Sequence, residues 1–147
     1  MFFGEYDHSL DEKGRLTIPA RYRDQLDNGA YITLGFDDNL MVMRSEDFDK
    51  LYHKVEGMSI TNTNARKLSR SVFGRAVLLE FDRNGRVLLP QFLRNLVKID
   101  STVKLVGIGQ YFEIWSPEMW SKTQGDIEDG EARARMFEEF DLTLKND

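Results

Sequence analysis

The chain reads DEKGRLTIPARYR at residues 11–23 and DRNGRVLLPQFLR at residues 82–94. Five positions are identical at an offset of 71 residues, and the positions between them keep their apolar character. The identical pairs are Asp11/Asp82, Gly14/Gly85, Arg15/Arg86, Pro19/Pro90 and Arg23/Arg94. Self-similarity at a fixed offset indicates two copies of one structural unit within a single chain.

Each copy opens with a tight turn followed by a short apolar strand. Gly14 in the first copy and Asn84-Gly85 in the second lie between apolar stretches, as the residues of hairpin turns do. We expect Asp11 and Asp82 to accept backbone N–H groups, and the two glycines to supply a positive φ. These four residues, two aspartates and two glycines, are therefore interpreted as structural parts of the turns.

A second hairpin is predicted further along each copy, over residues 31–44 and over residues 102–115. Both segments hold two apolar runs separated by a short turn. Ile32 aligns with Val103 when the offset of 71 residues is kept. The order of turn, strand, proline and second hairpin is thus the same in both copies.

Helices are predicted to follow the second hairpins. Ser45 and Ser116 are suited to N-cap positions, with acidic residues in the first turn after them. Between the copies, Leu68 and Val72 recur at helical spacing and Gly74 provides a C-terminal stop. A chain of β-hairpins with helices appended has the α+β fold class.

We expect three segments along the chain: a first repeat with its linker helix at residues 1–74, a second repeat at residues 75–125, and an acidic C-terminal tail at residues 126–147. Units of about 70 residues have little stability of their own. Two copies packed together would bury apolar surface that one copy alone leaves exposed, so the repeat predicts an intramolecular pseudo-dimer. Its exposed elements favour homo-oligomers.

The charge of the chain is distributed unevenly. The net charge is −5, and residues 126–147 hold eight acidic against three basic side chains, so the tail accounts for all of it. Basic clusters lie at residues 13–23, 66–75 and 83–94. Because local fields decide where a polyanion docks, the acidic total weakens a nucleic-acid interpretation without removing it.

Several classes of function are disfavoured by composition. The chain has no cysteine and only two histidines, which excludes disulfides and thiolate metal sites. No set of nucleophile, base and orienting residue can be named, so we expect no catalytic residue, no metal and no cofactor. Apolar runs of at most four residues predict no membrane-spanning segment. A hydrolytic or small-molecule-binding enzyme stays open as an alternative, with Asp37, Asp38 and Glu80 as its candidates.

Basic side chains accompany both turns. Arg15 and Arg86 directly follow them, while Lys13 and Arg83 lie within them. A guanidinium that projects from a rigid hairpin is suited to bidentate contact with a phosphate or a guanine edge. The residues alone leave two interpretations open, a nucleic-acid-binding surface or an ordinary solvated one.

A resemblance favours the first interpretation. The chain opens Met-Phe-Phe-Gly at residues 1–4, and it reads LVG at 105–107 and FEIW at 112–115. With the doubled Asp-x-x-Gly-Arg turns, each followed by a proline four residues after the arginine, these features resemble the MraZ family over nearly the whole chain.

The resemblance implies a bacterial transcriptional regulator built of two SpoVT-AbrB-like swapped-hairpin repeats. It implies a ring of several subunits that binds tandem short repeats in double-stranded DNA upstream of its own cell-division and cell-wall operon, and a cytoplasmic, nucleoid-associated protein. The DNA-contacting residues of the family correspond to Arg15 and Arg86, with Lys13 adjacent. A ring that acts only as a scaffold, with the basic turns as incidental surface, remains an alternative.

Overall fold

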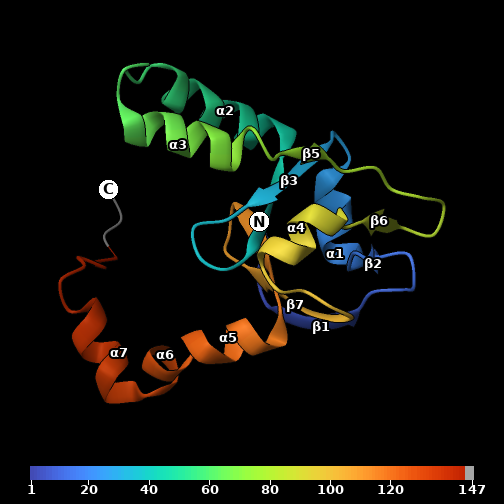
Figure 1. Cartoon of the computed structure of the whole chain (residues 1–147). Coiled ribbons are helices and arrows are strands. Elements are labelled where there is room, and N and C mark those ends of the chain that lie inside the picture. Colours follow the sequence, from blue (N-terminus) through green and yellow to red (C-terminus); the bar gives the residue numbers. More distant parts are fainter. Residues whose placement is uncertain (145–147) are drawn as a thin grey trace.

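Strands and helices follow one another in two similar series in the computed structural model, which describes residues 1–144 (Figure 1). The strands are β1 (Glu5–Ser9), β2 (Arg15–Thr17), β3 (Ala30–Leu34), β4 (Leu40–Arg44), β5 (Val77–Leu78), β6 (Arg86–Leu88), β7 (Thr102–Gly107) and β8 (Tyr111–Trp115). The helices are α1 (Ala20–Arg23), α2 (Ser45–Glu56), α3 (Thr63–Val72), α4 (Gln91–Leu96), α5 (Pro117–Thr123), α6 (Gly125–Glu128) and α7 (Gly130–Phe137), with a 3-10 turn, η1, at Asp24–Leu26. The α+β class is confirmed.

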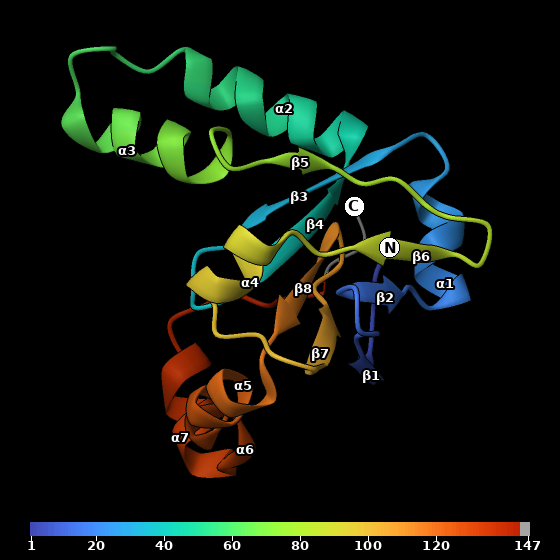
Figure 2. The same cartoon turned by 45° about the vertical axis from the view of Figure 1, so that its right-hand side comes forward.

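The two copies exchange their first strands. The main sheet has the order β1-β7-β8-β4-β3-β5, so β1 of the first copy pairs with β7 of the second, and β5 of the second copy pairs with β3 of the first. The remaining strands, β2 and β6, pair with each other in a separate antiparallel ribbon (Figure 2). The chain is therefore a pseudo-dimer of swapped hairpins.

The strand register shows the internal symmetry and corrects one alignment. In the ribbon, Leu16 pairs with Val87, which is its own equivalent 71 residues later. In the sheet Ile32 pairs with Val77, whereas Leu105 pairs with Tyr6, the equivalent of Val77. Ile32 therefore corresponds to Leu105, and the alignment of Ile32 with Val103 is wrong, because the second copy has two extra residues between Arg94, the equivalent of Arg23, and Leu105.

Both copies contribute to one hydrophobic core. In the ribbon Leu16 and Val87 are fully buried, while Thr17 and Leu88 are exposed, as expected from the two-residue period of a strand. The same buried cluster contains side chains from the main sheet and from α1 and α4. Burying one such large apolar side chain contributes about 1.5–3 kcal/mol, so the shared core binds the copies to each other.

A second, smaller cluster joins α2 and α3 to the outer part of the sheet. Met41, Met43 and Val72 are buried there, and Phe48 and Phe73 pack against them. The Asn62 side chain caps α3 by accepting a hydrogen bond from the Ala65 N–H at 3.0 Å, at a position that the sequence analysis did not single out.

The two predicted serine caps differ in outcome. Ser116 is confirmed as the N-cap of α5, since its Oγ accepts a hydrogen bond from the Met119 N–H at 3.0 Å. The expectation for Ser45 is wrong, because Ser45 is already the first residue of α2 and Arg44 occupies the cap position without a capping hydrogen bond to the helix backbone. Arg44 instead forms an ion pair with Asp47 in the first helical turn, at 2.7 Å.

The two helical arms leave the sheet at opposite ends. Helix α2 follows β4 and helix α5 follows β8, and these two strands are antiparallel neighbours. In both views the α2–α3 pair accordingly lies at one end of the molecule and α5–α7 at the other (Figures 1 and 2). No helix within residues 1–144 is both long and apolar enough to cross a membrane.

Candidate nucleic-acid interface

The first turn is organised by Asp11. Its carboxylate accepts the backbone N–H groups of Lys13 at 2.9 Å and of Arg15 at 2.8 Å, and the Arg15 Nε donates to it at 2.6 Å. Gly14, with φ of +81°, supplies the left-handed backbone that closes the turn. The hydrogen bond from the Arg15 backbone lowers the pKa of Asp11, against a smaller opposing effect of burial, so the carboxylate is charged at neutral pH.

The second turn repeats this arrangement around Asp82. The carboxylate accepts the backbone N–H groups of Asn84 at 2.9 Å and of Arg86 at 3.0 Å, and the Arg86 Nε at 2.9 Å. Gly85 has a φ of +74°. The Arg86 backbone N–H lowers the pKa of Asp82 as well. Because β2 and β6 are antiparallel, the two turns lie at opposite ends of the three-residue ribbon.

The arginines do not project freely from the turns, which differs from the sequence-based expectation. The side chains of Arg15 and Arg86 are only 33% and 27% exposed, because each guanidinium folds back onto the aspartate of its own turn. They lie on the outer face of the ribbon, since Leu16 and Val87 between them point into the core. The ion pairs hold both guanidinium groups in a fixed orientation.

Arg15 and Arg86 differ in which of their guanidinium nitrogens are free of hydrogen bonds. The Arg86 Nη1 also reaches across the ribbon to the Asp11 carboxylate, at 3.4 Å. Within residues 1–144, the terminal nitrogens of Arg15 make no hydrogen bond, since only its Nε and backbone N–H are engaged. Arg15 therefore presents its terminal nitrogen pair to solvent, whereas Arg86 shares one of its nitrogens with the other copy.

Two further arginines were not among the predicted site residues. Arg94 of α4 lies over Gly14, where an added Cβ would come within 2.6 Å of its terminal nitrogen, and Arg23 of the first copy lies over Gly85 in the same way. Arg94 is fixed by its Nε, which donates to the Leu89 carbonyl at 2.9 Å. Each copy thus covers the turn of the other. The signal was present in the sequence, as the fifth identity of the repeat.

Lys13 and Arg83 complete the basic surface. Both are exposed at the turns. With the two arginines of the ribbon and the two that cover the glycines, they make six basic side chains against three acidic ones, Asp11, Glu12 and Asp82. The structure therefore brings all four predicted basic residues to one ribbon, and the local charge there is positive although the chain is acidic overall.

The carboxylates proposed for an enzyme are not brought together. Asp37 and Asp38 are exposed in the turn after β3, whereas Glu80 lies beyond the other end of the same strand, next to the bond between the Leu79 N–H and the Ala30 carbonyl. Within residues 1–144, no group of three or more histidine, aspartate or glutamate side chains is arranged to hold a metal ion.

Comparison with known proteins gives the family. The family model described as "MraZ protein, putative antitoxin-like" matches twice, over residues 1–71 and 72–140. The chain is 40% identical over 137 residues to the Roseiflexus castenholzii protein named "Transcriptional regulator MraZ", covering 93% of this chain and 94% of that protein.

Proteins of the same name from two other bacteria are similar to comparable degrees. The identity is 42% over 121 residues for Carboxydothermus hydrogenoformans, covering 82% of this chain and 85% of that protein. For Moorella thermoacetica it is 38% over 143 residues, covering 97% and 100%. On the doubled family match and these relatives, the chain belongs to the MraZ family.

Proposed function

We propose that the protein is a sequence-specific DNA-binding regulator of transcription that acts on tandem short repeats upstream of its own cell-division and cell-wall operon. The relatives named as transcriptional regulators support the general role. The observation that carries the DNA-binding part is the β2–β6 ribbon, whose outer face holds Arg15 and Arg86 in fixed orientations.

The ribbon has the dimensions and groups that a DNA groove requires. Three residues of strand extend about 10 Å, and the major groove, about 12 Å wide, admits a two-stranded ribbon. The aspartates bind the Nε side of each guanidinium, which leaves the terminal nitrogens of Arg15 for bidentate contact with a guanine edge or a phosphate. Lys13 and Arg83, at the two ends of the ribbon, are placed to contact phosphates and fix its register.

Assembly into a homo-oligomeric ring would let several ribbons engage tandem repeats at once. Binding at a second repeat then becomes intramolecular, and the effective concentration raises affinity without any new contact. A nucleoid-associated location in the cytoplasm would follow from such binding. Size-exclusion chromatography with light scattering tests the assembly, and a monomer near 17 kDa at micromolar concentration would contradict it.

A gel shift at two salt concentrations tests DNA binding directly. The probes are the DNA upstream of the protein's own gene and the same DNA with its repeats scrambled. We expect the native repeats to bind at least about a thousandfold more tightly at physiological salt, the low end for specific regulators. Equal affinity for both probes would reject sequence-specific binding, and an intact oligomer that binds neither would favour the scaffold alternative.

A further inference from the structure

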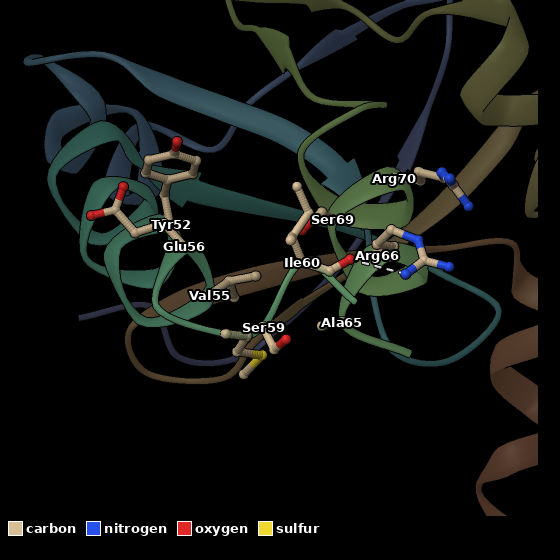
Figure 3. A pocket seen from close by; sticks show the side chains of 10 residues that line it. Tyr52, Val55, Glu56, Ser59, Ile60, Ala65, Arg66, Ser69 and Arg70 are labelled. Atoms are coloured by element: carbon tan, nitrogen blue, oxygen red, sulfur yellow. Dashed lines mark hydrogen bonds between the residues drawn. The ribbon is translucent and has the colours of Figure 1, made fainter. Parts of the chain in front are cut away.

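A groove lies between α2 and α3, outside the candidate DNA-binding ribbon. It is a cavity of about 490 Å³ near the connection of the two helices. Figure 3 shows Tyr52 and Val55 of α2 on one side, Arg66 and Arg70 of α3 on the other, and Ile60 of the connecting segment between them. Nothing in the proposed contact with DNA uses this groove.

The lining of the groove leaves large apolar side chains in water. Ile60 is 83% exposed, Met58 is 48% exposed and Tyr52 is 45% exposed. Single exposed apolar residues are ordinary on protein surfaces, but a group of them around one hollow is typical of a binding site. The groove is therefore suited to an apolar ligand.

The charge of the groove adds a second requirement. Within residues 1–144, no carboxylate lies within 4.0 Å of the basic groups of Arg66 or Arg70. Arg66 is held in place by a bond from its Nη1 to the Ile60 carbonyl, at 2.9 Å. The acid in the lining, Glu56, contacts His53 at 2.8 Å. A matching ligand would thus be acidic as well as apolar.

The C-terminal tail of this chain has that composition. Residues 137–144 read FEEFDLTL, in which acidic and large apolar residues are interspersed. Phe140, Leu142 and Leu144 are 56%, 74% and 99% exposed. Within the described residues, the three carboxylates of this segment, Glu138, Glu139 and Asp141, form no ion pair.

We propose that residues 137–144 of one protomer dock into the α2–α3 groove of a second copy of this chain. The apolar side chains would fill the hollow beside Ile60, and the carboxylates would face Arg66 and Arg70. The occupant comes from another copy because α2–α3 and α5–α7 leave opposite ends of the antiparallel pair β4–β8. This inference deepens the proposed oligomerisation, on which it rests.

A contact of this kind is heterologous, since the tail of each protomer meets the groove of the next. Heterologous contacts generate rings when the rotation closes and open filaments when it does not. Residues 137–144 therefore connect neighbouring protomers of the assembly. Their negative charge favours binding to the basic groove, whereas DNA, which is also negatively charged, would repel them.

Disulfide cross-linking of full-length chains tests the proposal without ambiguity, because the protein has no cysteine of its own. A chain carrying Ile60→Cys and a chain carrying Leu142→Cys, with different affinity tags, are co-expressed, purified free of nucleic acid and then mildly oxidised. The matched control replaces Ile60→Cys by Phe36→Cys, another exposed apolar position, 67% exposed in the β3–β4 turn. Docking raises the effective concentration of the two thiols, so we expect about tenfold more doubly tagged dimer than in the control.

Charge reversal provides the second arm. Arg66→Glu with Arg70→Glu on the Ile60→Cys chain should weaken the contact about tenfold and lower the yield, since two attractions become repulsions. Glu138→Lys with Glu139→Lys on the Leu142→Cys chain should restore it. Circular dichroism checks that each variant retains its fold.

Three results would overturn the proposal. These are a yield no higher than that of the Phe36→Cys control, a yield unaffected by charge reversal, and cross-linking confined to single chains when one chain carries both cysteines. Because the experiment contains no DNA, failure of the DNA-binding proposal in the gel shift would leave its outcome unaffected. A failed cross-link in a protein that light scattering shows to be an oligomer would reject the docking alone, whereas a monomer would reject the proposed assembly as well.

Discussion

The turns of the two copies share one backbone design and differ in their side chains. In each, an aspartate accepts two backbone N–H groups and a guanidinium Nε, with a glycine at positive φ. The first turn carries Lys13 and an Arg15 with free terminal nitrogens, whereas the second carries Asn84 and an Arg86 that is tied to Asp11. The second turn also has Arg83 where the first has Glu12, so the two turns differ both in charge and in which guanidinium nitrogens are free.

The exchanged strands differ as well. β1 pairs with β7 over five residues and is extended by a bridge between Phe2 and Gly109, whereas β5 pairs with β3 over two residues. Phe2 is fully buried against Tyr22 and Phe112, while its equivalent Phe73 is only partly buried beneath α2. The first copy's strand is thus the firmer of the two connections.

Separating the copies should have the largest effect. Residues 1–74 and residues 75–147, expressed as individual fragments, are expected to be poorly folded, because each would lack the partners of its exchanged strand and half of the shared core. Thermal unfolding followed by circular dichroism measures this. A cooperative transition in either fragment alone would show that the halves are independent domains. Mixing the two fragments should restore a cooperative unfolding transition.

Replacing each of the two equivalent phenylalanines, Phe2 and Phe73, by alanine should show which of the exchanged strands contributes more to stability. Phe2→Ala removes a ring that packs at 5.3 Å on Tyr22 and 5.2 Å on Phe112, and it should cost about 3–5 kcal/mol of the free energy of unfolding. Phe73→Ala empties a partly buried site at the edge of the smaller cluster, which can relax, so we expect about 1–2 kcal/mol. Urea titrations of the two variants measure the difference, and equal losses would contradict the asymmetry of the strands.

The smallest expected difference between the turns is in how Asp11 and Asp82 make the stability of the fold depend on pH. The folded state lowers the pKa of Asp11 and Asp82, so their contribution to stability is present above the usual aspartate pKa of about 3.9 and is lost as the pH falls through the lowered value. Each Asp→Asn substitution should therefore reduce the dependence of stability on pH below about pH 4.

The effect of Asp11→Asn should exceed that of Asp82→Asn, because Asp11 also accepts the bond from Arg86. Thermal melting at stepped pH values provides the measurement, with Asp38→Asn in an exposed turn as the control. Parallel pH profiles for all three variants and the unmodified protein would show that the turn carboxylates do not stabilise the fold.

Much of this architecture could be predicted from local sequence. The doubled motif indicated two copies, the second hairpins follow from apolar runs around short turns, and Ser116 was identified as a cap. Residues alone could not show that Tyr6 pairs with Leu105, since alternation identifies a strand and not its partner. The two extra residues between Arg94 and Leu105 likewise change the partner of Ile32 in the alignment of the copies, and no local feature of the sequence marks them.

The site was less predictable than the fold, for a physical reason. A sequence shows that Asp11 precedes Arg15 by four residues but not that the turn folds the guanidinium back onto the carboxylate. The arrangement of Arg23 and Arg94, each over the other copy's glycine, depends on the strand exchange and so on long-range packing. The residue types were visible from the repeat, and their mutual contacts were not.

The most direct test of the account compares Arg15→Ala, Arg86→Ala and the double variant in the gel shift on the upstream DNA. Each engaged arginine should contribute about 1–3 kcal/mol if it reads a base, and Arg15→Ala should weaken binding more than Arg86→Ala. Arg15→Lys keeps the charge and loses the bidentate fork, so it should relax sequence discrimination. Lys50→Ala on α2 is the control, and thermal melting confirms folding, because both arginines are ion-paired within their turns. Graded loss in this order supports the account, and full-strength specific binding by the double variant would contradict it.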